Sequence, residues 1–249
     1  MKNIYTTILS SLIDHPVQTV RIGLNWTAVV VEKESGLQCG LSSTLSGEHH
    51  HTGEPIIPDP GGLETLSGME LASWITSDHP LRWSVGCAAI NALLPREPAL
   101  WVNQNAEAEI LRRGRGKKTV LMGHFPFVKR LRQELDDFLV VELNPIGADL
   151  PVEEGWEHIP EADVLAVTGM TFVNHTLQEL LPRINPSAYM IMLGPSTPLS
   201  PILHSVGFDV LAGAVVEDIP AVLGALGQGA NFRQVHHAGV RLVTQAEAR

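Results

Sequence analysis

The chain has 249 residues, of which 44% are hydrophobic and 18% are charged, so it can bury a core and is not disordered. Its formal net charge of −10 disfavours nucleic acid as a partner, because duplex binding usually needs a concentrated basic face. Two cysteines are too few for a disulfide framework, and no apolar run reaches the roughly 18–20 residues of a membrane span, so we expect a cytoplasmic protein with no membrane partner.

The first half of the chain mixes helical and extended patterns. Apolar residues at helical spacing predict a first helix, which a proline ends. Runs rich in β-branched residues predict strands, and two helices follow a polar loop rich in Gly and Pro. This order predicts a small α+β unit. The expected elements are a helix over 4–13, a strand or hairpin over 19–32, a strand over 37–45, and helices over 63–76 and 82–94.

From residue 114 onwards, short apolar runs alternate with helical stretches. Continuous apolar strands between helices predict a parallel sheet with helices on both faces, which is a Rossmann-like α/β fold. We therefore expect an α+β domain over 1–113 and a Rossmann-like domain over 114–249. The basic segment at 112–118 is either a solvated linker or an anion-binding edge. The five predicted strands are KTVLMG (118–123), FLVVEL (138–143), DVLAVTG (163–169), YMIMLG (189–194) and DVLAGAVV (209–216).

Polar residues, Gly and Pro follow each of these predicted strands. In open α/β sheets, ligands bind outside the carboxyl ends of the strands, and the helix N-termini behind them favour anions. A single residue such as Thr171, Asn174 or Thr197 is better explained as a helix cap than as a ligand contact. Taken together, the five strand ends predict one small-molecule cleft. They read GHFPF (123–127), ELNP (142–145), TGMTFVNHT (168–176), GPSTPLSP (194–201) and VVED (215–218).

The conventional nucleotide motifs are missing from the sequence. The first strand of the second half ends without G-x-G-x-x-G, and Phe125 and Phe127 stand where glycine would clear space for a pyrophosphate. A P-loop is missing as well, so we expect neither NAD nor ATP in its usual binding mode. Neither cysteine follows a predicted strand and G-x-S-x-G does not occur, which disfavours a nucleophilic mechanism.

A run of histidines lies in the polar loop of the first half. His49, His50 and His51 stand between Glu48 and Glu54, and imidazole and carboxylate are good ligands for a divalent transition metal. Adjacent residues of an extended chain point to opposite sides, so three consecutive histidines need a further ligand from elsewhere. The alternative is a loop that closes over the substrate with one histidine as acid or base.

As a set, several motifs resemble a prokaryotic family of unknown function whose label is heavy-metal chelation. They are GHFPFV, ELNP, VTGMTFVNHTL, LGPSTPLSP and GFDVLAGAVVED, with CGLSSTL, HHH and SDHPL…GCAAINALL in the first half. The resemblance implies an enolase N-terminal-like domain, a Rossmann-like domain and a cleft between them. The matched cleft positions are His49, His50, His124, Phe125, Glu142, Asn144, Thr171, Asn174, His175, Gly194, Pro195, Ser196 and Thr197, and Gly123 adjoins them.

Three functional hypotheses follow from these observations. The first is a protein that binds a metal ion, a small metal-chelating molecule or an anionic metabolite in the cleft, with His49, His50 and His51 as metal ligands. The second is an enzyme acting on a small anionic metabolite, with His124 or His175 as general acid or base. The third is a non-catalytic regulatory module, with a homodimer as one possible form.

Overall fold

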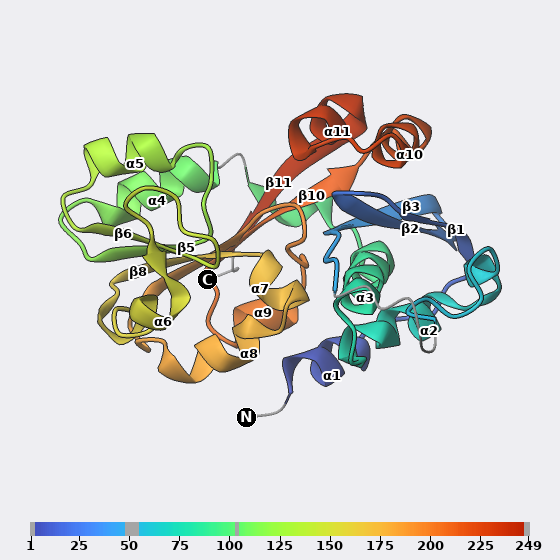
Figure 1. Cartoon of the computed structure of the whole chain (residues 1–249), viewed down its shortest axis with the longest axis horizontal. Coiled ribbons are helices and arrows are strands. Elements are labelled where there is room, and N and C mark those ends of the chain that lie inside the picture. Colours follow the sequence, from blue (N-terminus) through green and yellow to red (C-terminus); the bar gives the residue numbers. More distant parts are fainter. Residues whose placement is uncertain (1–2, 48–54, 103–104, 247–249) are drawn as a thin grey trace.

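The computed structural model describes residues 3–47, 55–102 and 105–246. Two groups of elements lie side by side in Figure 1, and each is built around its own sheet. A three-stranded antiparallel sheet and its helices form the first unit, and an eight-stranded, mostly parallel sheet flanked by helices forms the second. This arrangement confirms the predicted α/β class, with a Rossmann-like sheet preceded by a small α+β unit.

The elements are short, and no helix within the described ranges is both long and apolar enough to cross a membrane. The helices are α1 (Ile4–Leu9), α2 (Gly68–Ser73), α3 (Pro80–Leu93), α4 (Ala106–Gly114), α5 (Val128–Glu134), α6 (Val152–Gly155), α7 (Met170–Val173), α8 (Thr176–Leu180), α9 (Pro201–Ser205), α10 (Ile219–Gly227) and α11 (Phe232–Gly239). The strands are β1 (Val17–Ile22), β2 (Trp26–Lys33), β3 (Gly36–Ser43), β4 (Trp101–Val102), β5 (Thr119–Met122), β6 (Phe138–Glu142), β7 (Leu150–Pro151), β8 (Val164–Thr168), β9 (Tyr189–Leu193), β10 (Val210–Val216) and β11 (Val240–Ala246).

In the first unit, the segment predicted as a strand or hairpin is a hairpin. Its strands β1 and β2 pair antiparallel, and β3 pairs antiparallel with the other edge of β2. The long helix expected over 63–76 is divided: α2 has a 3-10 turn on each side of it, and its N-terminus is fixed by a capping box of Ser67 and Glu70. Helix α3 begins at Pro80, whose missing N–H costs nothing in the first turn.

The large sheet has the strand order β4-β11-β10-β9-β8-β5-β6-β7. All neighbours from β10 to β7 in this order pair in parallel. The chain runs outward from β5 through β6 to β7 and then returns to β8 on the opposite side of β5. The carboxyl ends of β5 and β8 therefore flank the topological switch point, where ligands of such sheets bind.

Three strands of the large sheet were not predicted from the sequence. β11 runs antiparallel to β10, and β4 pairs antiparallel with β11, so the sheet is mixed at this edge. Polar residues interrupt β11, and β4 and β7 have two residues each, so none of the three has the continuous apolar run of a buried parallel strand. The five predicted apolar runs correspond to β5, β6, β8, β9 and β10.

The two units share their hydrophobic cores. One cluster joins Ile8, Leu71 and Ile90 of the first unit to Val120 and Phe172 of the second. In Figure 1, α3 covers one face of the small sheet, and α10 and α11 lie over the other.

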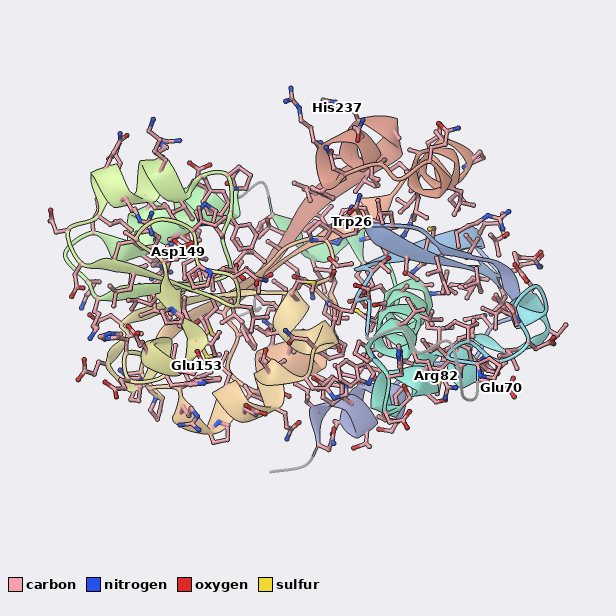
Figure 2. All side chains as sticks on the ribbon, in the orientation of Figure 1. Trp26, Glu70, Arg82, Asp149, Glu153 and His237 are labelled. Atoms are coloured by element: carbon pink, nitrogen blue, oxygen red, sulfur yellow. The ribbon has the colours of Figure 1, made fainter. Side chains whose placement is uncertain are left out.

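The C-terminal helices are attached to that second face by a further cluster. Trp26 and Leu41 of the small sheet pack there with Val222 and Val235 of α10 and α11, and Figure 2 shows Trp26 at this junction. The division of domains at residue 113 remains a prediction, although β4 and α4 before it contribute to the second unit by strand pairing and packing.

Candidate functional site

A pocket of about 370 Å³ opens at the switch point of the large sheet. Its walls come from the ends of β5, β6 and β8 and from Leu45, which follows β3. Three of the five strand ends expected to meet therefore do so around one cavity. The lining residues are Leu45, Met122, Gly123, His124, Phe125, Val141, Glu142, Leu143, Asn144, Val152, Thr168, Met170, Thr171, Asn174 and Thr176.

His124 stands at the end of β5 and is held by a buried carboxylate. Its Nδ1 lies 2.7 Å from Oδ2 of Asp149, whose side chain has no exposed surface. The other oxygen of Asp149 accepts a hydrogen bond from Arg132 of α5 at 2.6 Å, and the backbone N–H of Ile146 donates to Oδ2 at 3.0 Å. Figure 2 shows Asp149 within the lobe formed by α5, β6 and β8.

The surroundings of Asp149 keep this carboxylate ionised. Burial raises the pKa of Asp149, but the hydrogen bonds from Ile146, His124 and Arg132 outweigh that effect and hold it below its usual value. An ionised carboxylate accepts hydrogen bonds only, so Nδ1 of His124 must carry the proton between them. The second nitrogen, Nε2, makes no hydrogen bond to the described part of the chain.

Glu142 is the last residue of β6, and its carboxylate accepts hydrogen bonds from backbone N–H groups of the site. Oε2 accepts a hydrogen bond from the backbone N–H of His124 at 2.7 Å, and Oε1 accepts one from Leu143 at 2.8 Å. A longer contact of 3.4 Å joins Oε1 to the N–H of Asn144. Glu142 therefore ties the β5 loop to the β6 loop, which fixes the position of His124.

The opposite wall of the pocket is polar and comes from the end of β8. The hydroxyl of Thr171 donates to the carbonyl of Thr168, and Oδ1 of Asn174 accepts hydrogen bonds from the N–H and hydroxyl of Thr176. Oδ1 of Asn174 thus satisfies the first backbone N–H of α8, whose N-cap residue is His175, and this is close to the capping role that the sequence left open. Its Nδ2 group has no partner among the described residues and remains a donor for a ligand.

His175 is adjacent to this wall in sequence but is not among the residues that line the pocket. Its ring lies 4.3 Å from that of Trp83 and 4.6 Å from that of Tyr5, and Nε2 is 2.7 Å from the carbonyl of Ile75. Burial lowers the pKa of His175, so the neutral ring donates from Nε2 to that carbonyl. His175 connects the two units, and a catalytic role for it remains a prediction.

The loop after β9 also lies outside the lining of this pocket. Gly194 approaches it, since a Cβ added there would lie 3.9 Å from the Phe125 ring. Ser196 and Thr197 are buried, and Oγ of Ser196 accepts a hydrogen bond from the N–H of Ser43 in β3 at 2.9 Å. Ligand contacts for Gly194, Pro195, Ser196 and Thr197 remain predictions; the contacts of Ser196 join the two units.

Replacing Ser196 with alanine should lower the free energy of unfolding by about 1–3 kcal/mol, because the Ser43 N–H loses its acceptor. Urea unfolding of the parent and variant measures this difference. Ser187→Ala, at an exposed position, is the control and should change stability by less than about 0.5 kcal/mol. An S196A variant as stable as the control would contradict the assigned contact.

His49, His50 and His51 lie outside the described residues, so the structure does not place the expected metal ligands. Within the described ranges, no group of three or more His, Cys, Asp or Glu side chains could hold a metal ion. The described residues therefore offer His124 as a single nitrogen at the pocket rather than a complete coordination set.

Sequence reasoning missed Asp149 and Arg132, which control His124. Asp149 is in an irregular loop before β7, and Arg132 lies on α5 among other charged residues. Their contacts with each other and with His124 span 17 and 25 positions, and neither has a local sequence signal. The lining residues Leu45 and Val152 were also not singled out for the site.

The fold and the switch-point pocket define a two-unit α/β protein with a Rossmann-like sheet. Each unit matches the model of a known protein family. Residues 106–244 match DUF364 and residues 5–94 match DUF4213, both described as "Putative heavy-metal chelation". The chain belongs to the DUF364 family, with a DUF4213 segment preceding it. The resemblance noted from the sequence motifs is thus confirmed.

Similar proteins come from bacteria and archaea. An uncharacterized protein of Methanocaldococcus jannaschii is 26% identical over 219 residues, which cover 84% of this chain and 82% of that protein. A DUF364 protein of unknown function from Desulfitobacterium hafniense has a crystal structure with a TM-score of 0.82 at 23% identity, covering 98% of each chain. Another, from Pyrococcus horikoshii, gives a TM-score of 0.78 at 21% identity, again covering 98% of each chain. These structures support the fold.

Proposed function

We propose that this protein binds a small organic metal chelator, or its metal complex, in the switch-point pocket where Leu45 of the first unit meets the second. The observation that carries the proposal is the position of His124, held by buried Asp149 at the end of β5 and lining the pocket. The family description, heavy-metal chelation, agrees with this function. In this role the metal is cargo that arrives with its chelator.

The charges around the pocket favour a neutral chelator or a cationic complex over a free anion. Its described lining includes Glu142 but no Lys or Arg, and the whole chain has a formal net charge of −10. A carboxylate or phosphate would therefore be buried without a counter-charge, which is costly. The apolar walls, including Met122, Phe125 and Met170, suit a flat organic body.

Calorimetric titration with 2,2′-bipyridine, with Ni²⁺ alone and with their equimolar complex tests this proposal. We expect the complex to bind with a Kd on the order of micromolar, a free energy of about −8 kcal/mol. Met170→Trp, which places a larger side chain in the pocket wall, should weaken binding of the complex at least about tenfold, or about 1.4 kcal/mol.

Two controls separate the pocket from other sites. Leu24→Trp adds the same indole at a position that is 78% exposed and should leave binding of the complex unchanged. Replacing His49, His50 and His51 together by alanine isolates any binding of free Ni²⁺ by the histidine run. If the complex binds no more tightly than millimolar, or binds equally well to M170W, the proposed function is wrong.

A further inference from the structure

We infer that His124 is a proton acceptor for the bound chelator, and that the pocket takes chelators that are uncharged until they give up an O–H proton to bind metal. This inference rests on the proposed function and adds a substrate class and a chemical role to it. Asp149 and Arg132 act as positioning residues. Three features support this role. They are the tautomer of His124, the carboxylate against its ring, and a lining that has a free amide donor but no Lys or Arg among the described residues.

The hydrogen bonds around His124 determine its tautomer. Asp149 has hydrogen-bonding contacts with Arg132, Ile146 and His124, and the 2.7 Å contact with His124 places the imidazole proton on Nδ1. Nε2 then carries a lone pair. Because the ring lines the pocket and its side chain is 30% exposed, this lone pair is accessible to a ligand.

A carboxylate lies directly against the imidazole ring of His124. Asp149 contacts the ring directly, Arg132 faces the far oxygen of Asp149, and Glu142 accepts the backbone N–H of His124. Of these three groups, only the carboxylate of Asp149 touches the ring itself. A positive charge that forms on the ring is therefore compensated, as in catalytic dyads where a carboxylate stabilises the imidazolium.

The pocket offers a donor for the negative oxygen that such a transfer creates. Nδ2 of Asn174 has no partner among the described residues, whereas its Oδ1 is engaged with Thr176. No Lys or Arg lines the described pocket, so a ligand that is already anionic finds no full counter-charge there. The arrangement therefore selects a neutral molecule with an acidic hydroxyl, such as a phenol or a hydroxamic acid.

The chemical step is a proton transfer with no change in oxidation state. The O–H bond of the chelator breaks, and its proton forms a bond to Nε2 of His124. The electron pair of the O–H bond stays on the oxygen, which donates it to the divalent metal cargo. Ligand atoms must lose their protons to bind a metal, and here His124 retains the proton that would otherwise enter solvent.

Calorimetry with 8-hydroxyquinoline and Zn²⁺ tests this inference, and 8-methoxyquinoline provides a probe of the same shape without the proton. Zn²⁺ is titrated at about pH 7.5 into protein saturated with 8-hydroxyquinoline, in PIPES and in HEPES, whose ionisation enthalpies differ, so that the protons released to buffer can be counted. For the parent protein we expect about zero protons released per bound zinc–hydroxyquinoline complex, against about one for His124→Gln. The methoxy probe has no hydroxyl proton to give, so its binding should release no proton to buffer from either protein.

Asp149→Asn tests the positioning role, since it retains the shape of the carboxylate but removes its charge. We expect this variant to release a proton with 8-hydroxyquinoline as His124→Gln does, and to release none with 8-methoxyquinoline. Because Asp149 is buried, thermal melting checks that the Asp149→Asn variant still folds. His124 is partly exposed, so His124→Gln can by itself decide whether His124 accepts the proton.

The outcomes distinguish this inference from the proposed function. Binding of the quinolines with equal proton release from the parent and His124→Gln overturns the proton-acceptor role and leaves the pocket as a binding site. Binding of quinoline-8-carboxylate at least about tenfold tighter than 8-hydroxyquinoline overturns the substrate class. If no quinoline binds the parent protein, both the proton-acceptor role of His124 and the proposed binding of chelators in the pocket are wrong.

Discussion

Replacing Gly40 with alanine is expected to lower the free energy of unfolding by about 3 kcal/mol or more, which is a large part of the stability of a typical domain. Gly40 lies in β3, directly against α3. A Cβ at this position would be 2.2 Å from the carbonyl oxygen of Ala88 and 2.2 Å from the backbone nitrogen of Ala92. Because both atoms belong to the helix backbone, the whole of α3 must move away from the small sheet.

Chemical denaturation of Gly40→Ala and of a matched control measures this effect. Gly224 lies within α10, and a Cβ added there meets nothing within 4 Å. Gly224→Ala should therefore be neutral or stabilise the protein by up to about 1 kcal/mol, because alanine favours the helix. Equal stability of the two variants would show that β3 and α3 are not in the close contact described.

Replacing Glu109 with glutamine is the second change with a large expected effect, a loss of about 2–4 kcal/mol at pH 7. Glu109 is 2% exposed on α4 and accepts hydrogen bonds from Arg112 and Arg113 of the same helix. The hydroxyl of Tyr189 donates to it at 2.7 Å, and Arg113 lies 3.9 Å over the Tyr189 ring. A neutral amide leaves two arginines without their carboxylate.

The same group predicts a dependence of stability on pH. Burial raises the pKa of Glu109, but the hydrogen bonds from Arg112, Tyr189 and Arg113 outweigh it and lower the pKa to about 2 from an unperturbed 4.5. A carboxyl with a depressed folded-state pKa stabilises the protein above its unfolded value and loses that contribution as pH falls. The stability difference between the parent and E109Q should therefore shrink between pH 4.5 and pH 2.

Urea unfolding at pH 7, 4 and 3 checks both expectations. Glu107→Gln is the control, since Glu107 pairs with Arg130 at the surface, where that arginine is 62% exposed, and surface pairs contribute about 0–1 kcal/mol. A difference between E109Q and the parent that stays constant over this range would contradict the role of the ionised carboxylate. These contacts also show that the start of the basic segment is the last turn of α4 rather than a solvated linker.

Local patterns in the sequence predicted the parallel strands, and tertiary contacts account for most of what was not predicted. The apolar runs and the Gly123 turn identified the central strands because a strand buried on both faces needs a continuous apolar stretch. The polar positions of β11 and the use of α10 and α11 to cover the small sheet depend on partners far along the chain. A single sequence does not reveal such pairings.

The candidate site was predicted in part for the same reason. His124, Glu142 and Asn174 line one pocket because the carboxyl ends of parallel strands meet at one edge. The role of Glu142, which binds backbone N–H groups, was not predictable, whereas a role for Asn174 at the start of a helix was one that the sequence left open. The partner of His124, Asp149, reaches it from an irregular loop whose path no residue pattern specifies.

The shared hydrophobic core limits how the two segments of the chain could be exchanged between proteins during evolution. Residues 5–94 and 106–244 match separate family descriptions, yet Ile8 and Phe172 belong to one apolar cluster, and Trp26 packs with α11 in another. Exchange of either segment with that of a distant relative would bring together surfaces that had not adapted to each other. The two segments are therefore expected to change in step over evolution, and neither would be a portable module.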